Sequence, residues 1–186
     1  MKESCSITVL TQADIPALIE LTKGHISETG YFEQSWEEQQ EGKRRVFLAW
    51  EQDNLAGYVH LNRFPKYFPF RHLGIPEIQD LFVHTYFRRQ GIGEALVKAC
   101  EEEALSSQAI AIGIGVGVTK NFGTAQRLYM RLGYLPDGSG VVFERENLSN
   151  GDVRPIDDRL CLMLMKDLNP ESSTTDESSN QPPLRG

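Results

Sequence analysis

Residues 91–106 constrain the fold most strongly, because their apolar side chains recur at helical spacing. The apolar positions are Ile92, Ala95, Leu96, Ala99 and Cys100, and charged residues occupy the positions between them. A helix with one apolar stripe must cover a sheet or other helices. Residues 78–84, just before it, form a short apolar run typical of a strand. This strand–loop–helix unit predicts a mixed α/β (α+β) domain.

The rest of the chain alternates in the same way between strand-like and helix-like patterns. Further strands are predicted at 7–10, 46–51, 58–62, 109–118, 141–145 and 159–166, and further helices at 15–23, 34–40 and 124–132. Residues 64–76 contain three prolines and several aromatic residues, so a structured loop is expected there. A free strand edge at 159–166 would permit pairing, and thus a homodimer.

Length and composition favour one domain over residues 1–170, since 186 residues with 40% hydrophobic content suffice for a sizeable core. Residues 171–186 are rich in Ser, Thr and Pro and are expected to form a disordered tail. The net charge of -7 argues against a nucleic-acid partner. The sequence lacks a long apolar run and a signal-peptide-like start, so no membrane association and a cytoplasmic location are expected.

The cysteines and histidines do not suggest a metal site. Cys5, Cys100 and Cys161 are far apart, and the four histidines lack ligand spacing. Reduced thiols and no bound metal are therefore expected, and no nucleophile motif of the G-x-S-x-G type is present.

The loop before the long helix reads Arg88-Arg89-Gln90-Gly91-Ile92-Gly93. Glycines allow a ligand to approach the backbone, the first N–H groups of a helix have no internal partners, and the helix dipole favours an anion there. This loop is a candidate phosphate site, although a plain strand-to-helix turn has the same pattern. Neither a dinucleotide-binding fingerprint nor a Walker loop is present.

Two ordered motifs resemble the GNAT superfamily of N-acetyltransferases. Residues 78–93 are similar to its fourth strand and its Q/R-x-x-G-x-G/A loop, and residues 125–134 are similar to its A-x-x-L-Y-x-x-x-G-F/Y block. The resemblance implies transfer of an acetyl group from acetyl-CoA to a primary amine. It also implies a mixed sheet of about six to seven strands, splayed between the fourth and fifth, with about four flanking helices.

The resemblance also implies where acetyl-CoA binds. The backbone of Leu81, Phe82 and Val83 would pair with the pantetheine arm, and the Val83 N–H would contact the thioester carbonyl. The pyrophosphate would lie on Arg88, Arg89, Gln90, Gly91, Ile92 and Gly93, and the later motif would add Ala125 and Tyr129. Where the family often has Asn, this chain has Phe122, with Asn121 one position earlier. Asn121 would either contact the cofactor or cap the following helix.

For catalysis, the resemblance assigns Tyr129 as the group that protonates or hydrogen-bonds the leaving sulfur. Glu77 has the spacing from Gly91 of the glutamate in histone-acetylating members, and Asp80 is the second candidate base. Residues three apart on a regular strand lie on opposite faces, so only one reaches the cleft unless a bulge intervenes. Either carboxylate is equally compatible with solvation or pairing to Arg71 or Arg88, and a water chain remains an alternative base.

The resemblance implies an aromatic acceptor wall, which would suit an aliphatic or cationic amine, although ordinary core and loop packing would explain the same aromatic residues. The residues expected there are Tyr31, Phe32, Trp36, Tyr67 and Phe70, with Phe68 and Arg71 nearby. Gly113, Gly115 and Gly117 alternate along the fifth strand and would leave one face bare for a cofactor or a helix. The acceptor, a small-molecule or peptide amine, is not identified by the sequence. The rival interpretations are an acyl-CoA-binding or sensing module without turnover, and a nucleotide-binding protein.

Overall fold

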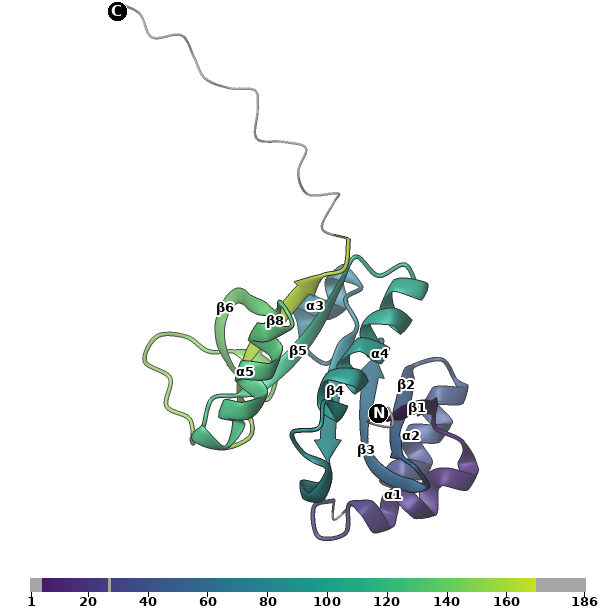
Figure 1. The fold of residues 1–186 in the computed structure, drawn as a ribbon. Coiled ribbons are helices and arrows are strands. Elements are labelled where there is room, and N and C mark those ends of the chain that lie inside the picture. The colour runs from purple at the N-terminus through teal and green to yellow at the C-terminus, as the bar shows by residue number, and fades with distance from the viewer. Residues whose placement is uncertain (1–4, 27, 170–186) are drawn as a thin grey trace, which may run out of the picture.

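The computed structural model describes residues 5–26 and 28–169, which form one mixed eight-stranded sheet with helices on both faces (Figure 1). The strands are β1 (Ser6–Val9), β2 (Arg44–Glu51), β3 (Asn54–Asn62), β4 (Glu77–Val83), β5 (Ala111–Gly117), β6 (Leu135–Phe143), β7 (Glu146–Asn147) and β8 (Leu160–Asp167). Their order is β1-β2-β3-β4-β5-β8-β6-β7, and only the β4–β5 pair is parallel. The mixed α/β prediction is confirmed, and the sheet is larger than expected.

Five α-helices and three short 3₁₀ turns connect these strands in the described part of the chain. The helices are α1 (Ile15–Leu21), α2 (Tyr31–Gln40), α3 (Phe68–Leu73), α4 (Ile92–Ser106) and α5 (Gly123–Arg131), and the turns are η1 (Gln12–Asp14), η2 (Thr85–Phe87) and η3 (Lys120–Phe122). Helices α4 and α5 share one apolar cluster with the sheet, whereas α1 and α2 pack in a second cluster. No helix among the described residues is long and apolar enough to cross a membrane.

Helix α4 follows directly from the sequence pattern. Ile92, Leu96, Val97, Cys100 and Ala104 are buried along one stripe that faces the sheet. This burial of a helical stripe against β-strands is what the apolar periodicity predicts. The tail expected at 171–186 lies outside the described residues.

Three local expectations were wrong. Residues 64–76 contain helix α3, because Pro69 lies in its first turn, where a missing N–H costs no hydrogen bond. The strand expected at 141–145 is the end of β6, and Glu144 and Arg145 form the turn to β7. Strand β8 lies between β5 and β6, so it offers no free edge for pairing.

The sheet opens between β4 and β5, as expected. The two strands pair at two positions, Glu77 with Gly113 and Ile78 with Ile114, and then separate. Nearby, the β3–β4 register shifts between Tyr58 and His60, so β4 carries one extra residue. The splay and the bulge therefore occur on the same strand, next to each other.

Candidate active site

The loop between β4 and α4 presents open backbone at the splayed end of the sheet. Gly91 is the N-cap residue of α4 and has a φ of 88°, which L-residues with side chains rarely adopt. A Cβ built on Gly91 would meet no atom within 4 Å, so the first turn of α4 is accessible. The Ile92 side chain is buried in the core, so this residue offers only its backbone to a ligand.

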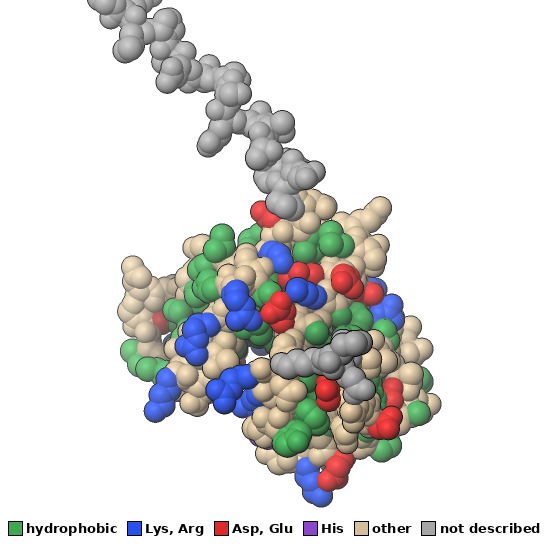
Figure 2. All heavy atoms as spheres, in the orientation of Figure 1, with side chains coloured by type: hydrophobic (Ala, Val, Ile, Leu, Met, Phe, Trp, Pro, Cys, Tyr) green, Lys and Arg blue, Asp and Glu red, His purple; other side chains and the backbone are tan. Residues whose placement is uncertain are grey.

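The charged side chains of this loop support its shape. The Arg88 Nε donates to the Val83 carbonyl at 3.0 Å, and the Gln90 amide donates to the Tyr86 carbonyl at 3.3 Å. Arg89 is exposed and has a φ of 60°. Lys and Arg side chains also gather over α5, beside this loop, on the face shown in Figure 2. The loop therefore has both the open N–H groups and the positive surroundings that suit an anionic ligand.

The second motif brings Tyr129 into the core beneath α4. Its side chain is 5% exposed, and burial raises the pKa of its hydroxyl to about 12. Burial alone accounts for this shift in pKa, without a contribution from a charged or hydrogen-bonded neighbour among the described residues. Ala125 is half-buried in the same cluster, and Asn121 is exposed. The N-cap position of α5 is Phe122, without a side-chain cap, so Asn121 does not cap this helix.

The three alternating glycines of β5 are covered by side chains, two of which come from helix α3 and the 3₁₀ turn η3. A Cβ on Gly113 would overlap the Phe70 ring of α3, and one on Gly117 would overlap the Phe122 ring of η3. A Cβ on Gly115 would lie 3.0 Å from the Arg145 guanidinium. The face expected to be bare is therefore filled from three separate parts of the chain.

The two candidate carboxylates of β4 have different environments. Glu77 is fully buried, and its Oε1 accepts from the Arg145 Nε at 2.9 Å and Nη2 at 2.8 Å. Burial raises the pKa of Glu77, and the charge of Arg145 opposes that rise. The partner is thus Arg145, and neither Arg71 nor Arg88.

Asp80, in contrast, is half-exposed, with a side-chain accessibility of 50%. It is the extra residue of the β4 bulge and has a φ of 53°. The Tyr31 hydroxyl donates a hydrogen bond to its carboxylate. Because of the bulge, Asp80 faces the same side of the sheet as Glu77, although the two lie three residues apart.

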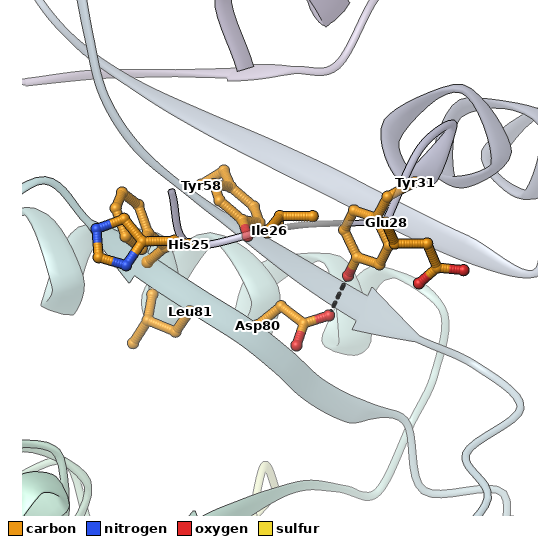
Figure 3. Close-up of a pocket in the computed structure, with 8 residues that line it drawn as sticks. His25, Ile26, Glu28, Tyr31, Tyr58, Asp80 and Leu81 are labelled. Carbon is orange, nitrogen blue, oxygen red and sulfur yellow. Dashed lines mark hydrogen bonds between the residues drawn. The ribbon is translucent and has the colours of Figure 1, made fainter. Parts of the chain in front are cut away.

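A pocket of about 460 Å³ opens around Asp80 (Figure 3). Its lining includes His25, Glu28, Tyr31, Tyr58, Asp80 and Phe82. The Tyr31 hydroxyl and the Asp80 carboxylate point toward each other in the pocket wall. No Lys or Arg of the described chain lines it. Two carboxylates and several aromatic rings make this a favourable environment for an amine.

Most of the aromatic residues predicted for the acceptor wall lie elsewhere. Phe32, Tyr67 and Phe70 are 1–2% exposed and pack in the core, and Trp36 packs against the cluster that contains Phe32. Tyr31 alone of the five lines the pocket. The remaining four therefore support the fold, and their positions do not favour contact with an acceptor.

His60 lies behind the pocket and was missed by sequence reasoning. Arg44 Nη1 donates to its Nδ1 at 2.9 Å, and its ring stacks on Tyr31 with centroids 5.6 Å apart. Burial lowers the pKa of His60 to about 4, although the nearby Asp80 charge favours the protonated form. This neutral, buried ring supports Tyr31 from behind. Only the three-dimensional pairing of β3 with β4 brings it there, so no local motif could identify it.

The described residues contain no group of three or more His, Cys, Asp or Glu side chains arranged for a metal ion. The open loop and the splay, however, fit an elongated anionic ligand with an extended arm.

Comparisons with known proteins identify the family and the fold. The family model for the acetyltransferase (GNAT) family matches residues 15–134. No curated protein sequence matches the chain. Similar solved structures include the acetyltransferase YncA from Salmonella typhimurium with acetyl-CoA, which has a TM-score of 0.67 and 16% identity and covers 95% of this chain and 100% of its own.

Two further structures are similar at comparable levels. A ribosomal-protein-alanine N-acetyltransferase from Brucella melitensis has a TM-score of 0.65 and 19% identity, covering 87% of this chain and 99% of its own. The spermidine/spermine N-acetyltransferase SpeG from Vibrio cholerae has a TM-score of 0.64 and 16% identity, covering 92% and 97%. At these identities the structures demonstrate a shared fold.

The family match covers more than half of the chain, so the protein belongs to the acetyltransferase (GNAT) family. This family consists of acetyltransferases, so the protein is an acyltransferase.

Proposed function

We propose that the protein is an N-acetyltransferase that transfers the acetyl group of acetyl-CoA directly to a primary amine within a ternary complex. The observation that carries this proposal is the β4 bulge, which turns Asp80 into the pocket wall next to the point where β4 leaves β5. A carboxylate, an acidic pocket and an open splay thus adjoin one another. That arrangement suits an ammonium group that must bind, lose a proton and meet an acyl donor.

Acetyl-CoA supplies a thioester, whose carbonyl carbon bonds to the amine nitrogen while its carbon–sulfur bond breaks. On the donor side, the residues that would hold it are the backbone of Leu81, Phe82 and Val83, the 88–93 loop, and Asn121 and Ala125 beside α5. The open backbone at Gly91 supports this assignment. The Val83 N–H would donate to the thioester oxygen.

On the acceptor side, Asp80 would bind the amine as a cation, which must release one proton to solvent before its nitrogen can attack the thioester. The nitrogen becomes far more acidic as its bond to carbon forms, so the Asp80 carboxylate would then accept the second proton from the tetrahedral adduct. Tyr31 donates to this carboxylate and fixes its direction. Asp80 is better suited than Glu77, because Glu77 is fully buried and paired.

Tyr129 would give its proton to the leaving sulfur. Its raised pKa, about 12, keeps the hydroxyl protonated at neutral pH. This property suits a general acid, which must hold a proton until the reaction takes it.

Calorimetric titration with acetyl-CoA tests the donor half of the proposal. We expect micromolar-range binding, which Gly91→Glu abolishes by placing a carboxylate at the first turn of α4. Gly42→Glu is the matched control, since Gly42 has a φ of 74° and an equally open surrounding. If both variants bind as the native chain does, the 88–93 loop is not the phosphate site.

A thiol-release assay with a panel of amines tests the acceptor half. The panel contains butylamine, putrescine, spermidine, an alanine-starting peptide and N-acetyl-lysine amide, because the similar structures act on spermidine and on ribosomal-protein alanine. Acetylation of one of these amines above the rate of acetyl-CoA hydrolysis would support the proposal. Tight binding of acetyl-CoA without turnover on any amine would favour the acyl-CoA-binding module.

A further inference from the structure

Arg145 reaches the base of the splay from a distant part of the chain. It lies in the β6–β7 turn, where Glu144 and Arg145 have φ values of 52° and 71°. Two successive residues with side chains in the left-handed region are uncommon and cost conformational energy. The turn projects the Arg145 guanidinium onto Gly115, where a Cβ would lie 3.0 Å from it. Glycine at this position therefore leaves room for the arginine.

The guanidinium lies at the point where β4 and β5 separate. The last paired residues are Ile78 and Ile114, so Gly115 is the first β5 residue beyond the pairing. From there Arg145 contacts Glu77 on β4, and its Nη1 lies 3.6 Å from the Cys161 Sγ on β8. One side chain thus connects three strands at the base of the splay, on the face that also carries Asp80.

Glu77 is fully engaged in this arrangement. Its Oε1 accepts from two nitrogens of Arg145, and its Oε2 accepts from the Gln79 amide at 3.0 Å. The side chain has no exposed surface. A general base must reach the proton that it removes, and this carboxylate is already enclosed by donors.

We propose that Arg145 and Glu77 are a positioning pair, which fixes where β4 and β5 separate and so aligns the donor-binding backbone of β4 with Asp80. Glu77 is then not the base. This inference rests on the proposed function, because it concerns how the acyl donor and Asp80 are aligned for that reaction.

The charges of the pair make its two halves unequal. Removing Arg145 leaves a carboxylate with no exposed surface, whereas removing Glu77 leaves a guanidinium that is 23% exposed. Leaving one buried charge without its partner destabilises a protein far more than replacing both charged residues with neutral ones. Loss of Arg145 should therefore disturb the site more than loss of Glu77, and neutralising Glu77 should relieve part of that disturbance.

Three variants test the inference by thiol release with the best amine of the panel: Arg145→Gln, Glu77→Gln and the double variant. We expect Arg145→Gln to lower kcat at least about tenfold, with acetyl-CoA affinity within about threefold of the native value. The double variant should recover activity relative to Arg145→Gln. If Glu77 were the base, Glu77→Gln would be the most impaired single variant, and the double variant would stay equally inactive, which overturns the inference.

The pH dependence of melting provides a readout that is independent of turnover. The charged groups facing Glu77 are Arg145 from the β6–β7 turn, Asp80 on β4 and the Cys161 thiol on β8. The pKa of Glu77 is already raised by burial, and loss of Arg145 raises it further. In Arg145→Gln, Glu77 therefore stays protonated in the folded chain at pH values where it is ionised in the unfolded chain. The free energy of unfolding then falls as pH rises from the pKa of Glu77 in the unfolded chain to its higher pKa in the folded chain.

Arg145→Gln should therefore melt at a lower temperature relative to the native chain as pH increases above about 4.5, and the double variant should lose this dependence. A uniform drop in melting temperature for Arg145→Gln, with unchanged kcat, would make the pair merely structural and would overturn the inference. Failure of the native chain to bind acetyl-CoA would instead overturn the proposed function itself.

Discussion

The proposed donor side of the splay, where acetyl-CoA would bind, is built largely from one continuous stretch, whereas the proposed acceptor side is assembled from separate segments. Residues 77–93 supply the separating strand, the loop and the start of α4. The pocket opposite takes Tyr31 from α2, Tyr58 from β3 and Asp80 from β4. The donor side depends mostly on local backbone geometry, while the acceptor side depends on how distant elements pack.

This difference explains how one fold can keep its donor and change its acceptor. An open helix start and a separating strand are properties of the backbone, and they tolerate varied side chains around them. The acceptor pocket is defined by side chains, so each substitution there alters the chemistry directly. Asp80 adjoins both sides, and its replacement should have the largest effect on the reaction.

Asp80→Asn should lower kcat/KM about 100- to 1,000-fold, because the amide removes the proton acceptor. Asparagine tolerates the left-handed conformation of this bulge position, and its carbonyl still accepts from Tyr31. The fold and the donor side should therefore persist, and acetyl-CoA affinity should stay within about twofold by calorimetry.

Glu33→Gln provides the matched control for that measurement. Glu33 is exposed on α2, near Tyr31 in sequence, and it does not line the pocket. Glu33→Gln removes one negative charge, as Asp80→Asn does. Equal losses of kcat/KM in both variants would mean that the net charge of the protein, and not the carboxylate of Asp80, causes the effect. A normal rate for Asp80→Asn would point to a water chain as the base.

Substitutions of the β5 glycines that other side chains cover should change the free energy of unfolding. Gly113→Ala places a methyl group against the Phe70 ring, and overpacking of this kind costs about 2 to 3 kcal/mol. Gly123→Ala is the control, because its Cβ would meet only the flexible Arg127 side chain at 3.8 Å. Urea unfolding of both variants measures the difference. Equal stabilities would mean that Phe70 moves aside at little cost, and that the face tolerates a ligand after all.

What the sequence predicted follows the same division. Helix α4 and its place directly after β4 depend on residues close together in the chain, and these predictions were confirmed. The splay between β4 and β5 was expected from the family resemblance, and it is present. The role of Arg145 was not predicted, because its contact with Glu77 joins residues 68 positions apart. The alternating glycines were expected to leave one face bare for a cofactor or a helix, and spacing alone did not indicate which side chains cover it.

The corrections on β8 and α3 have related causes. An apolar strand pattern does not specify its neighbours, so the central position of β8 between β5 and β6 required the whole topology. Proline is a helix breaker only within a helix, and at Pro69 it begins one. For Glu77 and Asp80, spacing predicted opposite faces unless a bulge intervened. The bulge places both on one face, and the burial of Glu77 against Arg145 distinguishes them.

Acid should weaken the acceptor side of the molecule through His60. Its pKa is about 4 when folded and about 6.5 when unfolded, so the folded chain binds fewer protons between these values. The contribution of neutral His60 to the free energy of unfolding is complete above pH 6.5 and is lost as pH falls toward 4. The free energy of unfolding should drop by about 2 kcal/mol from this group between pH 7 and pH 5.

Urea unfolding at the two pH values measures this drop, and His60→Gln should reduce it, since glutamine does not titrate. His72→Gln should leave it unchanged, because His72 lies exposed on α3. If the stability of His60→Gln has the same pH dependence as that of the native chain, another group causes the drop, and His60 does not stabilise the acceptor side in this way.

Tyr129→Phe should have the smallest effect of these changes and separates binding from chemistry on the donor side. We expect kcat to fall about tenfold, with acetyl-CoA affinity and stability nearly unchanged. Phenylalanine keeps the ring packed in the apolar cluster that α4 and α5 share with the sheet, so the fold should persist. Stopped-flow thiol release and calorimetry on the same preparations measure the two quantities.

The pH profile makes this last prediction sharper. With a pKa of about 12, Tyr129 stays protonated across the neutral range, so its loss should lower the rate by a constant factor from pH 6 to pH 9. An unchanged rate would mean that the thiolate leaves without assistance from this hydroxyl. Because a thiol with a pKa of about 8.5 is a tolerable leaving group, proton donation should contribute less than proton removal by Asp80. The order of the two effects therefore tests which side of the splay limits the reaction.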